Sequence, residues 1–208
     1  EYTVTDNSGN IATCTFTVTV NDTEFPMITC PSDVSVDNLQ GLCGAIVSFT
    51  APSGTDNCPG VTTSQTAGLV SGTVFPVGTT VQTFTATDAS GNATNCSFNV
   101  TVNDTEAPTI ACPSDITVGT DPGSCDAVVN FTAPTGNDNC SGATVALSAG
   151  LASGSTFVLG TTVQTYTVTD ASGNMASCSF NIIVIDDEDP TITCPSNIAV
   201  SNDAGICG

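Results

Sequence analysis

Cysteines and carboxylates are the residues of this 208-residue chain whose types and spacing could do chemistry. The chain has eleven cysteines and 20 Asp and Glu residues but no lysine, arginine or histidine, so its net charge near pH 7 is −20. Without histidine or lysine the commonest general bases and Schiff-base nucleophiles are absent, and no imidazole can hold zinc. Because phosphates must be neutralised by cations, we expect no binding of nucleic acid, and an anionic membrane surface would repel the chain.

Catalysis is not expected either. Serines and carboxylates are present, but no base is available to activate a nucleophile, and carboxylates recur along the chain instead of gathering in one stretch. No apolar run approaches the roughly 20 residues that span a membrane, so we expect no membrane insertion. The composition leaves cations, glycans and copies of the chain itself as suitable partners.

An internal repeat explains the cysteine spacing. Residues 25–106 and 107–188 align without a gap and are identical at 47 of 82 positions. A fixed period is typical of a tandem array, and a unit of this length can be a domain with its own core. The cysteines that recur at this step are Cys14, Cys96 and Cys178; Cys30, Cys112 and Cys194; Cys43, Cys125 and Cys207; and Cys58 and Cys140.

The repeat also sets the expected domain organisation. We predict the C-terminal part of a repeat over 1–24, complete repeats over 25–106 and 107–188, and the N-terminal part of a repeat over 189–208. We therefore expect the chain to be an excerpt from a longer array. An odd number of cysteines follows from such a cut and does not indicate a reactive thiol.

Alternation of apolar and polar residues predicts β-strands in each repeat. Residues 43–49, 83–87 and 96–102 alternate with period two, and threonine fills many outward positions. Clusters of Gly, Pro, Asn and Asp separate the runs, and no stretch shows a sustained helical period. This pattern predicts an all-β sandwich. The residues expected to point into the core of the first complete repeat are Ile28, Cys30, Val34, Val36, Ala45, Val47, Phe49, Leu69, Phe75, Phe84, Phe98, Val100 and Val102.

Each repeat carries a set of short motifs around its cysteines, turns and strands. The motifs in the first repeat are Cys30-Pro31, Cys43, Thr55-Asp56-Asn57-Cys58, Phe75-Pro76-x-Gly78-Thr79-Thr80, Asp88-x-Ser90-Gly91-Asn92 and Cys96-x-Phe98-x-Val100-x-Val102. The second repeat carries the pattern again, and one departure is Val158 where the first has Pro76. The combined motifs resemble the hyalin repeat (HYR) family. The resemblance implies tandem immunoglobulin-like β-sandwich domains in an extended array, used in extracellular adhesion and surface architecture without catalytic activity.

Four cysteines in each repeat could form disulfides or a Cys₄ zinc site. The CxxC pairs typical of zinc sites are missing, so disulfides and an extracellular or cell-surface location are favoured. In an immunoglobulin-like order Cys58 and Cys96 lie at the same end of the sandwich, which favours their pairing, although the two other connectivities stay open. The predicted bridges are Cys30–Cys43, Cys58–Cys96, Cys112–Cys125, Cys140–Cys178 and Cys194–Cys207.

Acidic residues gather in the linkers and in two loops of each repeat. In an immunoglobulin-like fold, a linker would meet those loops of the following domain at one end, as in cadherin-like modules, and converging carboxylates suit Ca²⁺. The alternatives are that the loop aspartates cap their own turns and that the linkers are only solvated. The candidate calcium ligands are Asp22, Glu24, Asp56, Asp88, Asp104, Glu106, Asp138 and Asp170.

Asparagines in N-x-S/T sequences offer sites for glycans. Because the chain is rich in threonine, many such matches arise by chance, and ordinary strand surface is the alternative interpretation of each. The candidate glycosylation sites are Asn21, Asn92, Asn95, Asn99, Asn103, Asn130 and Asn139.

These features favour a structural protein: disulfide-stabilised repeats that form a secreted or surface-attached fibre. Its partners would be copies of itself or glycans and proteins of the cell surface and matrix. The alternatives are a non-polymerising adhesin stalk that presents a ligand-binding tip, and an accessory region of a secreted enzyme.

Overall fold

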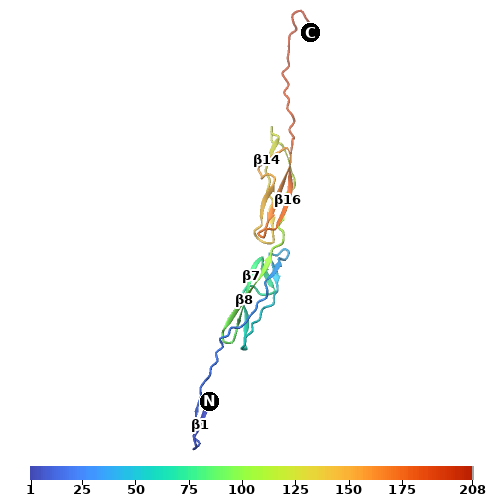
Figure 1. Cartoon of the computed structure of the whole chain (residues 1–208). Helices are drawn as coiled ribbons and strands as arrows, with labels where there is room; N and C mark the ends of the chain where they lie inside the picture. The colour runs from blue at the N-terminus through green and yellow to red at the C-terminus, as the bar shows by residue number, and fades with distance from the viewer. Residues whose placement is uncertain (208) are drawn as a thin grey trace. The chain divides into compact units, whose positions relative to one another are not determined.

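The computed structural model describes residues 1–207. The chain divides into two compact units, Glu1–Glu106 and Ala107–Gly208. Every regular element of the described residues is a β-strand, so the chain is all-β (Figure 1). Among these residues no helix is long and apolar enough to cross a membrane. The outer bounds predicted for the repeats stay predictions.

The first unit begins with a separate hairpin and continues into a sandwich. Strands β1 (Tyr2–Thr5) and β2 (Ile11–Cys14) pair in antiparallel fashion. The sandwich has a four-stranded sheet in the order β3-β8-β7-β5 and a second sheet of β4 and β6. The strands of the sandwich are β3 (Val34–Asp37), β4 (Gly44–Val47), β5 (Thr62–Ala67), β6 (Thr73–Pro76), β7 (Gly78–Thr87) and β8 (Ala93–Asn103).

The second unit repeats this topology, as expected from the sequence repeat. Its larger sheet has the order β10-β16-β15-β13, and two further pairs are β11-β14 and β12-β9. The strands are β9 (Thr109–Ile110), β10 (Ile116–Gly119), β11 (Asp126–Val129), β12 (Gly136–Asn137), β13 (Thr144–Ala149), β14 (Ser155–Val158), β15 (Gly160–Thr169) and β16 (Met175–Ile185). Both units are therefore immunoglobulin-like sandwiches, as predicted.

The predicted core is confirmed in the first unit. All thirteen residues expected to point inward lie in its hydrophobic cluster, seven of them buried and the others partly buried. Phe49 contacts Phe75, Phe84 and Phe98 edge-on, with ring centroids 6.3, 6.3 and 5.1 Å away. Such aromatic pairs add stability beyond the apolar area that they bury.

A buried glutamine in the long central strand was not anticipated. Gln82 of β7 is fully buried, and its Oε1 accepts a hydrogen bond of 2.8 Å from Nε2 of Gln65. A Cβ on Gly68 would lie 2.2 Å from Oε1 of Gln82. The signal was available in the sequence, because the period-two alternation of β7 puts Gln82 on the same face as the core residue Phe84.

In the larger sheet of each sandwich, the first strand along the chain runs parallel to the last. Val34 of β3 pairs with Val100 of β8, an offset of 66 residues. Ile116 of β10 pairs with Ile182 of β16 at the same offset. This pairing brings the segment that enters each repeat beside the strand that leaves it.

The cysteines form disulfides, but the predicted pairing is wrong. Cys30 is bonded to Cys96 and Cys112 to Cys178, each with a separation of 66 residues. The parallel register explains this, because the offset that pairs the strands also places Cys30 beside Cys96. Cys96 is not at the start of its strand but is the fourth residue of β8. Four of the predicted bridges are therefore wrong: Cys30–Cys43, Cys58–Cys96, Cys112–Cys125 and Cys140–Cys178.

The fifth predicted bridge is also wrong. Cys194 and Cys207 are both exposed and free. The described residues after β16 form no strand, so no pairing of strands brings these two cysteines together.

Candidate functional site

The aspartate that opens each Asp-x-Ser-Gly-Asn motif caps its own turn. Oδ1 of Asp88 accepts hydrogen bonds from the backbone N–H groups of Ser90 (2.9 Å) and Asn92 (2.8 Å), and Oδ2 accepts one from Nδ2 of Asn92 (2.8 Å). Burial of the carboxyl opposes its ionisation, but these hydrogen bonds outweigh burial and lower the pKa of Asp88. Asp170 makes the same contacts with Ser172 and Asn174. Both carboxylates are occupied by their own turns.

Two other candidate ligands come together at the N-terminal end of the first sandwich. Carboxylate oxygens of Asp22 and Asp56 and the Sγ atom of Cys58 all lie within 4.8 Å of one another. Oδ2 of Asp22 is buried without a hydrogen-bond partner. Glu24 lies beside this group, where its Oε2 accepts a hydrogen bond of 2.8 Å from Nδ2 of Asn57.

The negative charge of this group acts on the cysteine. A hydrogen bond to Asp22, burial and the nearby carboxylates of Asp56 and Asp88 raise the pKa of the Cys58 thiol. Asp56 also holds the loop, since its Oδ2 accepts a hydrogen bond of 3.0 Å from the backbone N–H of Cys58. Asp138 does the same for Cys140 in the second unit, at 2.8 Å.

The C-terminal end of each sandwich holds the linker that follows it. Oε2 of Glu106 accepts a hydrogen bond of 2.6 Å from the backbone N–H of Gly41, and Oδ1 of Asn38 accepts one of 3.0 Å from the N–H of Thr105. In the second unit Glu188 accepts from the N–H of Gly123 at 3.0 Å. Glu106 therefore contacts the repeat that precedes it, whereas the sequence predicts that the linker acids meet loops of the repeat that follows.

A carboxylate clamp between the parallel strands was missed in the sequence. Asp33 accepts hydrogen bonds from the backbone N–H (2.8 Å) and Nδ2 (3.0 Å) of Asn99, and these bonds lower the pKa of Asp33. Asp115 and Asn181 form the same clamp. The signal was the recurrence of both residues at the 82-residue step, but only the parallel register shows that they meet.

The candidate glycosylation sites differ in how their amide groups are used. Nδ2 of Asn92 donates to Asp88, that of Asn99 to Asp33, and that of Asn103 to Ser35 at 3.2 Å. Asn139 is partly buried. The remaining candidates have exposed side chains: Asn21, Asn95 and Asn130.

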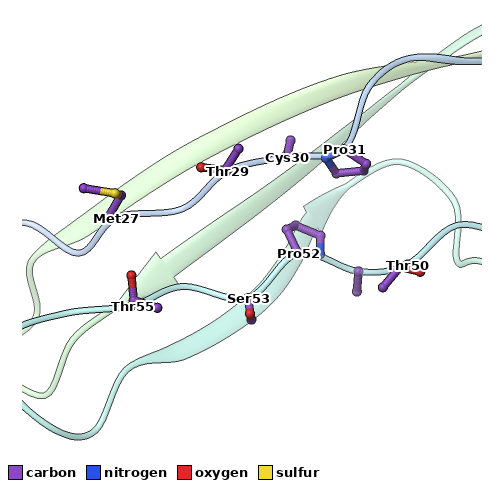
Figure 2. A pocket seen from close by; sticks show the side chains of 9 residues that line it. Met27, Thr29, Cys30, Pro31, Thr50, Pro52, Ser53 and Thr55 are labelled. Atoms are coloured by element: carbon purple, nitrogen blue, oxygen red, sulfur yellow. The ribbon is translucent and has the colours of Figure 1, made fainter.

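A shallow groove of about 490 Å³ lies between two segments of the first sandwich. Figure 2 shows Met27, Thr29 and Pro31 on one side and Thr50 and Pro52 on the other. All nine residues that line it are uncharged. The groove offers hydroxyl groups but no ionisable side chain, because its one cysteine, Cys30, is in a disulfide.

Comparisons with known proteins agree on the family. The HYR domain model matches residues 21–102 and 103–184. Hyalin of Strongylocentrotus purpuratus is 40% identical over 217 residues, which cover 100% of this chain and 18% of that protein. Hyalin of Lytechinus variegatus is 39% identical over 209 residues, with 94% and 38% covered. The chain thus spans less than half the length of either hyalin.

More distant similarities were also found. The mouse sushi, von Willebrand factor type A, EGF and pentraxin domain-containing protein 1 is 33% identical over 174 residues, 81% of this chain and 5% of that protein. Among solved structures, the protocadherin gammaB4 extracellular domain aligns with a TM-score of 0.40 and 19% identity, covering 78% of this chain and 34% of that chain. On the two matches to its family model and the identity to both hyalins, the chain belongs to the HYR domain family.

Proposed function

We propose that this chain is a mechanical element of an extracellular fibre, in which its repeats carry tension from one end to the other. Its family and its disulfides support an extracellular structural or adhesive role. The observation that carries the proposal is the position of one bridge in each repeat: Cys30–Cys96 in the first and Cys112–Cys178 in the second.

The bridge defines the path of tension through a repeat. Tension enters along the segment before Cys30 and leaves along β8, which continues from Cys96 to Asn103. Because Cys30 and Cys96 are covalently bonded, tension passes directly between them, and the chain between them cannot be extended. That chain accounts for the whole separation of 66 residues and contains most of the core. The repeat is therefore built to stay folded under load.

The parallel strands beside the bridge add a second resistance. Where the bridge is reduced, pulling the two ends of the sandwich apart would slide β3 along β8, so their ladder of hydrogen bonds, together with the clamp between Asp33 and Asn99, would be loaded all at once. Bonds that must break together resist tension better than bonds that open one at a time. This arrangement suits a fibre better than a ligand pocket.

Electron microscopy of native extracellular material, labelled with an antibody against this chain, tests the fibre. The proposal expects label along continuous filaments that are much longer than one chain. Label confined to single thin stalks with a distinct tip would contradict the fibre and support an adhesin stalk instead.

We also propose that Ca²⁺ binds at the N-terminal end of a repeat. The support is the meeting of Asp22 and Asp56 and the buried Oδ2 of Asp22 that has no hydrogen-bond partner, since oxygen ligands suit this ion. Asp88 and Asp170 are left out of this proposed site, because their carboxylates accept hydrogen bonds from their own turns.

Thermal unfolding in Ca²⁺ and in EDTA tests the calcium site. The expected result is a lower Tm after chelation in the unaltered chain and no such difference in the variant Asp22→Asn/Asp56→Asn. An equal Tm in the two buffers for the unaltered chain would contradict the site. Asp189→Asn, at an exposed carboxylate in the linker after β16, is the matched control.

We further propose that the extracellular chain carries glycans at its exposed sequons, Asn21, Asn95 and Asn130. Their side chains are exposed and hold no hydrogen bond that a glycan would break. In contrast, a glycan on Asn99 would break the clamp to Asp33.

A further inference from the structure

Two cysteines of each complete repeat take no part in its internal bridge: Cys43 and Cys58 in the first repeat, and Cys125 and Cys140 in the second. In the first repeat Cys43 is in a disulfide and Cys58 is free, so they are not bonded to each other. In the second repeat Cys140 is in a disulfide and Cys125 is free. Cys43 is therefore not bonded to Cys58, and Cys125 is not bonded to Cys140.

The positions of these cysteines within one sandwich explain why. Cys43 follows the loop in which Gly41 binds Glu106 and Asn38 binds Thr105, so it lies at the C-terminal end of β8. Cys58 lies with Asp22 at the other end, and a Cβ on the nearby Gly60 would lie 3.2 Å from the side chain of Ala89, in the turn before β8.

The length of β8 separates the two cysteines. Eleven residues at about 3.3 Å per residue span roughly 35 Å. A disulfide requires the two Cα atoms to lie within about 7 Å. Cys43 and Cys58 therefore cannot pair with each other while the repeat is folded. The same holds for Cys125 and Cys140, since β16 is also eleven residues long and Gly123 binds Glu188 beyond its end.

We call Cys43 and Cys125 the Cys43 type, and Cys58 and Cys140 the Cys58 type. We propose that these cysteines link repeats to one another, in that a cysteine of the Cys43 type in one repeat forms a disulfide with a cysteine of the Cys58 type in another copy of the repeat.

Mixed pairing follows from the polarity of the repeat. In a tandem chain the C-terminal end of one repeat is followed by the N-terminal end of the next, so a link in series joins the Cys43 type to the Cys58 type. Pairing of two cysteines of one type would join like ends and stop after two repeats. A series of links that continues along a fibre requires a cysteine of one type at one end of each repeat and a cysteine of the other type at the opposite end.

The chemistry of the link is thiol–disulfide exchange. A thiolate of one type attacks a small disulfide such as oxidised glutathione and releases one glutathione thiolate. The thiolate of the other type then attacks the protein sulfur of this mixed disulfide and displaces the second glutathione. The S–S bond of the oxidant is exchanged for one in the protein, and two electrons and two protons pass from the protein thiols to glutathione.

Disulfide mapping of the whole 208-residue chain tests the proposal. The chain is secreted from cells, its thiols are blocked, and it is digested at acidic residues, because it has no Lys or Arg for trypsin. The expected product is a peptide with a Cys43-type cysteine linked to one with a Cys58-type cysteine from the other repeat. Links within a repeat, links between two cysteines of one type, or four free thiols would each overturn the proposal.

The mass of the undigested chain identifies the source of the partner repeat. A single-chain mass shows that the linked repeats belong to one chain, and covalent oligomers that disappear on reduction show that they belong to neighbouring chains. The variant Cys43→Ser/Cys125→Ser should lose the mixed link and leave Cys58 and Cys140 open to alkylation. Cys14→Ser should keep the mixed link, and retention of Cys30–Cys96 shows that each variant is folded.

Discussion

At the scale of single residues, carboxylates hold the loops and strands of this protein together. The motif Asp-x-Ser-Gly-Asn was interpretable from sequence as a capped turn, because its aspartate accepts hydrogen bonds from residues of the same motif. The clamp of Asp33 on Asn99 was not, because its two residues are 66 apart and meet only through the parallel register. Sequence thus predicts local roles of acids well and their long-range roles poorly.

The turn aspartates should make stability depend on pH. The pKa of Asp88 and Asp170 is lowered from the ordinary value of 3.8, so their contribution is fully present above that value and lost as the pH falls through the folded-state pKa. The variant Asp88→Asn/Asp170→Asn should therefore have a lower Tm than the unaltered chain at pH 7. The difference should shrink below pH 3.8.

Thermal unfolding followed by circular dichroism from pH 7 to pH 2 measures this difference. The control is Asp189→Asn, whose side chain is exposed and which should have the Tm of the unaltered chain throughout. A Tm difference that stays constant down to pH 2 would show that the turn carboxylates do not act through ionisation.

The exposed sequons should carry glycan and the clamped one should not. In chain secreted from animal cells, peptides with Asn130 should shift in mass after enzymatic deglycosylation, and peptides with Asn99 should not, because its Nδ2 is held by Asp33. Asn130→Gln should remove one glycan, whereas Asn99→Gln should leave the glycan mass unchanged. Greater occupancy at Asn99 than at Asn130 would contradict this assignment.

At the scale of elements, the parallel pairing of the first and last strands of the larger sheet organises each repeat. Alternation predicted the long strands and all thirteen core positions, because a strand with one buried face has a period of two. It did not predict the partner of β3, since a strand of four residues carries too little pattern to specify a parallel register. The disulfide prediction failed for the same reason.

The contact between Gly68 and the buried Gln82 should be sensitive to a single methyl group. Gly68→Ala would place a Cβ within 2.7 Å of three atoms of the Gln82 amide, at a φ of +94°. Crowding of a packed core adds to the strain of positive φ, so we expect a loss of about 3 kcal/mol in the free energy of unfolding.

Gly78→Ala is the matched control for this substitution. Gly78 has a φ of +108°, but a Cβ there would meet open space, so only the backbone strain of about 1–2 kcal/mol applies. Urea denaturation measures both variants. Equal losses for the two would show that the contact with Gln82 has no part in stability.

Removal of the internal bridge should cost more than any of these changes. Cys30 and Cys96 close a loop with a separation of 66 residues, for which loop-closure entropy gives about 4 kcal/mol. Cys30→Ser/Cys96→Ser should lower the free energy of unfolding of the first repeat by this amount in urea denaturation. The control is Cys14→Ser, at an exposed free cysteine, which should leave the free energy of unfolding of the first repeat unchanged. If Cys30→Ser/Cys96→Ser also left this free energy unchanged, the bridge would have no stabilising role.

At the scale of the whole molecule, composition and repetition predicted the class of protein better than its covalent structure. The absence of basic residues and the repeated cysteines indicated an extracellular structural protein, and the chain belongs to the HYR domain family. The pairing of the cysteines could not be predicted, because it depends on which cysteines the fold brings together. A correct pairing requires the register of β3 on β8.

Single-molecule force spectroscopy of the chain tests the path of tension most directly. With Cys30–Cys96 intact, the chain between these cysteines cannot extend. In Cys30→Ser/Cys96→Ser, unfolding of the first repeat should lengthen the molecule by about 220 Å more, from 66 residues at about 3.3–3.6 Å each. The second repeat keeps Cys112–Cys178 as an internal control. Equal unfolding lengths with and without the bridge would contradict a covalent path of tension through the repeat.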